Sequence, residues 1–123
     1  MVRSTGSSVR RTSSKQRLRD VLAKFFEERI GPSGEMEVKI VEDLIFVRFK
    51  GVISPSEVNL GAIKVGRLLL QEVSERLCQE LQPDLARLLY RITGLRLVDV
   101  CVGLFLQRRE KIYLFTMSDT VRH

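Results

Sequence analysis

Tryptophan is absent from this chain of 123 residues, and histidine and cysteine are scarce, with one His and two Cys. Both Cys78 and Cys101 lie in apolar segments, which is typical of small buried side chains and not of a disulfide framework. Metal centres and nucleophilic sites need several such side chains at short spacing, and the sequence has no such cluster. We therefore expect no metal, no cofactor and no enzyme activity. A small enzyme of unknown reaction is a third alternative, suggested only by Asp99, an acid inside an apolar strand.

Long apolar runs are missing as well. The longest nearly apolar run, Leu97 to Leu106, is ten residues long and is interrupted by Asp99. A membrane-spanning helix needs about 20 apolar residues. The chain also does not open with a charged start, an apolar stretch and a cleavage site, as a secretory signal would. We expect a protein that does not span the membrane and that works in the reducing cytoplasm.

The positive charge is confined to one end of the chain. The net charge is +6, and residues 20–123 hold 15 basic and 15 acidic residues, so the whole excess comes from residues 1–19. The six basic residues of this arm are Arg3, Arg10, Arg11, Lys15, Arg17 and Arg19. Residues 1–13, rich in Ser and Thr, are predicted to form a flexible basic tail. The arm is either a candidate contact for nucleic acid or another anion, or a solvated extension without a role.

The sequence from the end of the basic tail to residue 50 predicts a helix followed by a hairpin. The helix is expected to begin at Ser13 or Ser14 and to end at Gly31-Pro32. Strands at 36–41 and 44–50 are expected to pair around a turn at Glu42-Asp43. Residues 44–47 are apolar on both faces, which favours an interior strand for the second of these.

The middle of the chain predicts two more helices. Ser54-Pro55-Ser56-Glu57 is a capping box at the start of a short helix. A long helix is expected over residues 64–93, with a kink or break at Pro83. Its apolar residues step by four, so both halves are predicted to cover the same sheet. These residues are Val65, Leu69, Val73, Leu77 and Leu81.

Strands at 95–107 and 111–117 are predicted to form a second hairpin. The fold class is then α+β, with helices packed on a four-stranded, largely antiparallel sheet in the order α-β-β-α-α-β-β. A single domain is expected over residues 14–118, with a frayed C-terminus at 119–123.

The 95–107 strand is apolar on both faces. One alternating set is Val98, Val100, Val102, Leu104 and Leu106, and the other is Leu95, Leu97, Cys101 and Phe105. Because the helices of one chain cover one sheet face comfortably, an uncovered second face predicts a homodimer. Its interface is expected to involve the first set, through the sheet face or the edge of this strand. The alternative is that the first helix crosses over and buries the second face.

Several segments, taken in order, resemble small bacterial domains of the MpsC type. They are Gly31-Pro32, residues 38–40 and 44–57, Gly66-Arg67, residues 92–95 and residues 114–116. The resemblance covers about residues 16–118. It implies association with a sodium-translocating system that generates membrane potential, with a membrane-transport protein as partner, and a place at the inner face of the cell membrane. The leading function is a non-catalytic protein-interaction module accessory to that system; a nucleic-acid-associated module is the alternative.

Overall fold

The computed structural model describes residues 3–31 and 34–122, with side chains from Lys15 onward. Its elements are α1 (Arg3–Arg29), β1 (Glu35–Val41), β2 (Leu44–Lys50), α2 (Pro55–Leu60), α3 (Lys64–Thr93), β3 (Leu97–Phe105), the 3-10 turn η1 (Leu106–Arg108) and β4 (Glu110–Met117). The predicted α+β class and element order are confirmed.

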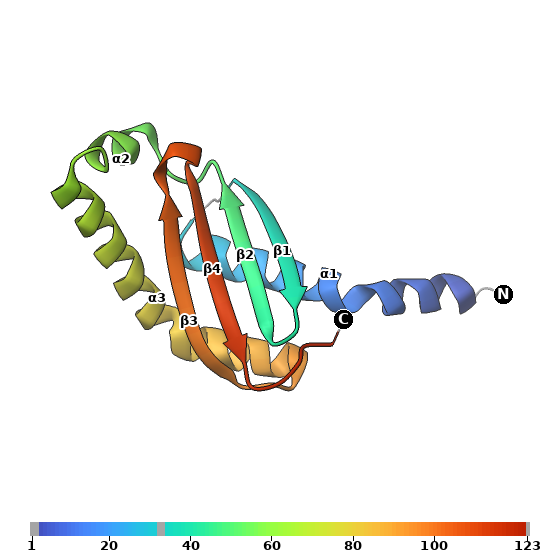
Figure 1. The fold of residues 1–123 in the computed structure, drawn as a ribbon. Coiled ribbons are helices and arrows are strands. Elements are labelled where there is room, and N and C mark those ends of the chain that lie inside the picture. Colours follow the sequence, from blue (N-terminus) through green and yellow to red (C-terminus); the bar gives the residue numbers. More distant parts are fainter. Residues whose placement is uncertain (1–2, 32–33, 123) are drawn as a thin grey trace.

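The four strands form one antiparallel sheet in the order β1-β2-β4-β3 (Figure 1). The expected interior position of β2 is confirmed, since it pairs with β1 on one side and β4 on the other. β3 lies at a free edge and has an irregularity in its pairing between Leu97 and Asp99. The predicted long strand is therefore too long: it starts at Leu97 and ends at Phe105, where η1 begins. Arg109 takes a left-handed conformation after η1 and turns the chain back into β4.

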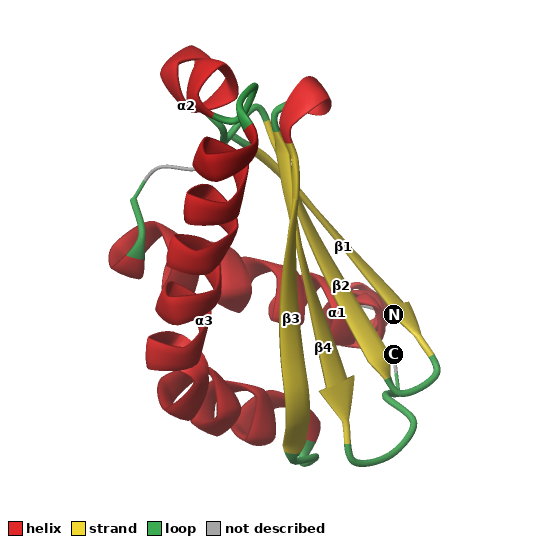
Figure 2. Cartoon of the chain, turned by 60° about the vertical axis from the view of Figure 1, so that its left-hand side comes forward, coloured by secondary structure: helices red, strands yellow, loops and turns green. Residues whose placement is uncertain are grey.

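All the helices lie on one side of the sheet (Figure 2). The core forms where α1 meets that inner face: the ring of Phe26 lies 5.1 Å from that of Phe49 and 4.8 Å from that of Tyr113. Leu22 and Leu18 are buried one and two turns earlier in α1. The alternative in which the first helix crosses to the second face is wrong.

The opposite side of the sheet has no helix over it (Figure 2). The strand register places a mixture of apolar and charged side chains on that side. Strand pairing aligns its apolar members in adjacent rows. We call this surface the open face; its apolar residues are Val41, Leu44, Phe46, Cys101, Phe105, Ile112 and Leu114.

The helix α3 runs through Pro83 and changes direction along its length (Figure 1). Proline lacks the amide hydrogen of the i to i−4 bond and crowds the preceding turn, so the bend at this proline is expected. The predicted kink is confirmed. Gly94 then closes α3 in a left-handed conformation, with its amide donating to the carbonyl oxygen of Tyr90 over 2.8 Å.

The described structure continues past both ends of the predicted domain, residues 14–118, whose bounds stay a prediction. The helix α1 begins at Arg3, ten residues before Ser13, so residues 3–13 are helical where a flexible tail was expected. No proline interrupts this segment, and extending a helix already nucleated by packing costs little. At the other end, Val121 is 4% exposed and its amide donates to the carbonyl oxygen of Glu42 over 2.8 Å. Residues 119–122 are thus held against the β1–β2 turn; His123 lies outside the described residues.

Candidate functional site

Among the described residues, the largest group of exposed aliphatic side chains lies on the first half of α3. We call this set the α3 ridge: Val65, Leu68, Leu69, Val73 and Leu77. Their exposed fractions run from 77% for Val65 to 41% for Leu77. Ile63 and Leu60 beside them are also exposed. The prediction that the stripe faces the sheet in both halves of the helix is wrong for the first half.

The geometry of the helix accounts for this error. A step of four residues turns about 40° beyond a full turn, so a row of such steps spirals around the helix. The row that starts at Val65 therefore begins facing solvent and reaches the sheet side only near Leu81, which is half-buried. The buried positions of α3 are Gly66, Ser74, Cys78, Leu85 and Leu89.

Small residues let α3 approach its neighbours in this half. A Cβ atom added at Gly66 would lie 1.9 Å from the carbonyl oxygen of Leu60, so the end of α2 lies directly against α3. Ser74, about two turns further along the same side of α3, is also buried. The small side chains therefore face inward here, and the large aliphatic ones face outward.

Ion pairs cross the open face beside its apolar residues. The guanidinium of Arg48 on β2 donates to Glu110 on β4 through Nε (3.1 Å to Oε1) and Nη2 (3.0 Å to each oxygen). Its Nη1 also lies 3.4 Å from Glu37 Oε1 on β1. The hydrogen bonds that Arg48 donates to Glu110 are the main cause that raises the pKa of Arg48 above its ordinary value. The pair joins residues that are 62 positions apart in the sequence, so it can be found only from the strand register.

The predicted dimer residues of β3 do not share one environment. Val102 is buried under the helices and Val100 packs against the same core. Leu104 and Leu106 are half-buried, whereas Val98, at the pairing irregularity, is exposed. Their role in a dimer stays a prediction.

The free edge of β3 is partly occupied by a side chain of the same chain. Gln71 of α3 donates from Nε2 to the carbonyl oxygen of Val102 over 2.9 Å. An edge irregularity and an occupied carbonyl both hinder strand addition. The sheet face is thus better suited than the β3 edge to receive a partner.

The predicted anion contacts of the basic arm divide into two groups. Lys15, Arg17 and Arg19 are exposed on α1, and Arg19 Nη2 lies 3.4 Å from the carbonyl oxygen of Met36. The side chains of Arg3, Arg10 and Arg11 lie outside those that the structure describes.

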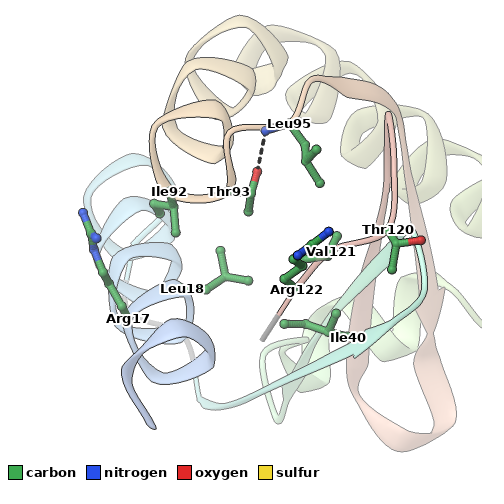
Figure 3. A pocket seen from close by; sticks show the side chains of 9 residues that line it. All are labelled: Arg17, Leu18, Ile40, Ile92, Thr93, Leu95, Thr120, Val121 and Arg122. Carbon is green, nitrogen blue, oxygen red and sulfur yellow. Dashed lines mark hydrogen bonds between the residues drawn. The ribbon is translucent and has the colours of Figure 1, made fainter. Parts of the chain in front are cut away.

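A cavity of about 300 Å³ lies between α1, β1, the end of α3 and the C-terminal segment (Figure 3). Leu18, Ile40, Ile92 and Val121 form its apolar wall. The hydroxyl of Thr93 is already engaged: it donates to the carbonyl oxygen of Leu89 and accepts from the amide of Leu95. Arg17 points away from the apolar centre (Figure 3). The polar groups do not converge on a ligand.

The two thiols differ from the expectation that both are buried. Cys78 is buried, and burial raises its pKa to about 11. Cys101 is exposed, which corrects the prediction; it lies on the open face of an edge strand, 3.9 Å from Oδ2 of an exposed Asp99. Among the described residues, no three His, Cys, Asp or Glu side chains gather as metal ligands.

One comparison with known proteins identifies the family. A family model described as "Na+-translocating membrane potential-generating system (MpsC)" matches residues 10–119. The chain belongs to the MpsC family. The match to MpsC spans every strand and both α2 and α3, so the α3 ridge and the open face both lie within it. No curated protein and no solved structure matches the chain. Within residues 3–31 and 34–122 of this MpsC chain, no helix combines the length and apolar character that crossing a membrane requires.

Proposed function

We propose that this MpsC chain is a non-catalytic protein-interaction module, an accessory component of a sodium-translocating system that generates membrane potential. In this proposal it acts as a homodimer at the inner face of the cell membrane and binds a membrane-transport protein. The family description supports the transport setting.

The observation that carries the proposal is the amount of apolar surface left uncovered. The α3 ridge and the open face lie on opposite sides of the sheet, because the helices cover only one of its faces (Figure 2). Exposed apolar patches of this kind mark protein interaction sites. A module that self-associates and also binds a partner needs two separate surfaces, and the fold provides two.

The proposal is tested by purifying the tagged chain from membranes of its native cells in mild detergent. We expect a multispan ion-translocating protein to be enriched. The double variant Leu44→Lys/Phe46→Lys, which places two charges on the open face, should lose that protein while its circular dichroism and thermal melt stay close to wild type. Lys24→Glu, on the exposed side of α1, is the matched control and should retain it.

A second measurement tests the physiological role. Cells lacking the gene should show a smaller sodium-dependent membrane potential, restored by the wild-type chain and not by Leu44→Lys/Phe46→Lys. An unchanged potential, together with no enriched transport protein, would overturn the proposal. Deleting residues 1–13 distinguishes the nucleic-acid alternative: if the arm carries the function, that deletion and not the open-face variant abolishes it.

A further inference from the structure

The α3 ridge is too apolar and too exposed to be ordinary surface. Each Leu or Val side chain contributes about 1.5–3 kcal/mol when it is fully buried. With Leu60 and Ile63, the ridge leaves on the order of 500 Å² of side-chain surface uncovered, near the upper limit for the largest apolar patch on a monomer. A stable interface buries about 800 Å² on each partner. The ridge and its surroundings supply most of that area.

The charges around the ridge indicate what covers it. The exposed charged residues between positions 64 and 80 are three basic and three acidic: Lys64, Arg67, Arg76, Glu72, Glu75 and Glu80. Glu72 and Arg76 form an ion pair of 3.3 Å. A surface that binds an anionic membrane or a nucleic acid has an excess of basic residues around it. A neutral rim of alternating sign suits a surface that carries the same charges, namely a second copy.

We propose that two copies of the chain associate through the α3 ridge, with the two α3 helices antiparallel and the two-fold axis passing midway between Leu69 and Val73. This inference rests on the homodimer of the proposed function and names the surface through which that dimer forms. In a two-fold interface, each residue that contacts a second one is contacted by it in turn.

The antiparallel arrangement pairs four of the five ridge residues with one another. Leu69 packs on Val73 of the second copy, and Val65 packs on Leu77 of the second copy. A parallel arrangement would instead place Glu72 against Glu72 and Arg76 against Arg76, each a like-charge contact. The dimer leaves the open face on the far side of each sheet free for the transport partner.

The oligomeric state is measured first, by light scattering coupled to gel filtration. Wild type should elute as a dimer of twice 14.1 kDa. Leu69→Glu should raise the dimer dissociation constant at least about 100-fold, because symmetry buries the new charge twice. Tyr90→Glu is the matched control: Tyr90 is exposed on the same helix beyond Pro83, outside the α3 ridge, and its variant should stay dimeric.

Disulfide trapping then tests the arrangement. In a Cys101→Ser background, a mixture of Leu69→Cys and Val73→Cys chains should form a cross-linked heterodimer under mild oxidation. Leu69→Cys alone or Val73→Cys alone should cross-link far less. In a dimer of two identical variants, the two engineered cysteines lie on opposite sides of the two-fold axis. Strong cross-linking of Leu69→Cys with itself would overturn the antiparallel arrangement.

The failures of this inference and of the proposed function are distinguishable. A wild-type dimer that Leu69→Glu leaves intact and Phe46→Glu dissociates would place the homodimer on the open face and refute the α3 ridge. A wild-type monomer at about 100 μM would refute the homodimer altogether, while co-purification with a transport protein would still uphold the interaction module. Binding of such a monomer to phosphatidylglycerol vesicles, lost in Leu69→Glu, would make a membrane the occupant.

Discussion

Arg48 and Glu110 face each other across β2 and β4, with the carboxylate accepting three hydrogen bonds from one guanidinium at 3.0–3.1 Å. The Glu110 side chain is 9% exposed and that of Arg48 is 32% exposed, so the carboxylate is the desolvated member of the pair. A charge held in such a place depends on its partner, because removing one member leaves the other buried and uncompensated.

Arg48→Met should therefore lower the thermal midpoint by roughly 5 °C or more. The double variant Arg48→Met/Glu110→Leu should recover much of that loss, since it leaves no unpaired charge. Arg108→Met is the control, because Arg108 is exposed and its Nη1 lies 4.0 Å from Glu110. Equal midpoints for Arg48→Met and wild type would show that the pair has no structural weight.

The contact between Gly66 and Leu60 allows a second stability test. An exposed Gly→Ala change in a helix interior normally stabilises by about 1 kcal/mol. Here the new Cβ would meet the Leu60 carbonyl oxygen at 1.9 Å, so Gly66→Ala should instead destabilise by about 1–3 kcal/mol in urea unfolding. Gln79→Ala, an exposed change on the same helix, should be close to neutral. A stabilised Gly66→Ala variant would contradict the close approach of α2 and α3.

Local patterns predicted the elements well where a residue's neighbours in sequence are also its neighbours in space. The capping box is one example: Ser54 Oγ accepts from the amide of Glu57, and the Glu57 carboxylate accepts from the amide of Ser54. The apolar run at 44–47 is another, because a strand apolar on both faces belongs inside a sheet. Each of these two patterns is contained within a few consecutive residues, so the sequence alone is enough to recognise it.

The α3 ridge and the open-face ion pair could not be predicted in the same way. A step-of-four row looks like a core stripe in sequence, and only the placement of the sheet decides which 120° of the helix is buried. Arg48 and Glu110 become partners through the β2–β4 register. The apolar neighbours of Cys101 in the sequence predicted a buried thiol, but the edge position of β3 leaves it exposed.

The different positions of the two thiols lead to a simple labelling test. At pH 8, one equivalent of a chromogenic disulfide reagent should react quickly with exposed Cys101, and the second should react only after unfolding. Burial and the raised pKa of Cys78 both keep its thiolate scarce. Cys101→Ser should abolish the fast phase and Cys78→Ala should leave it intact. Two fast equivalents in the wild-type protein would contradict the packing of α3 on β3.

Alkaline pH should destabilise the fold through the same core. Burial raises the pKa of the Cys78 thiol from 9.0 to about 11 and that of the Tyr113 phenol above its ordinary 10.0. Above about pH 9 the unfolded chain releases these protons while the folded chain keeps them, so the free energy of unfolding falls as pH rises. Lys111 acts in the opposite direction: burial lowers its pKa, so raising the pH relieves a cost in the folded state.

Urea unfolding between pH 8 and 10.5 measures this balance. The free energy of unfolding should fall by on the order of 1–3 kcal/mol across the range. Tyr113→Phe should flatten the upper part of the profile, because it removes one group whose proton the fold retains. Lys111→Met should steepen the profile, because it removes the opposing contribution. Tyr90→Phe is the control, since its ring is exposed, and should follow wild type. A flat wild-type profile would mean that the phenol and the thiol ionise in the folded chain as readily as in the unfolded one, against their burial between the helices and the sheet.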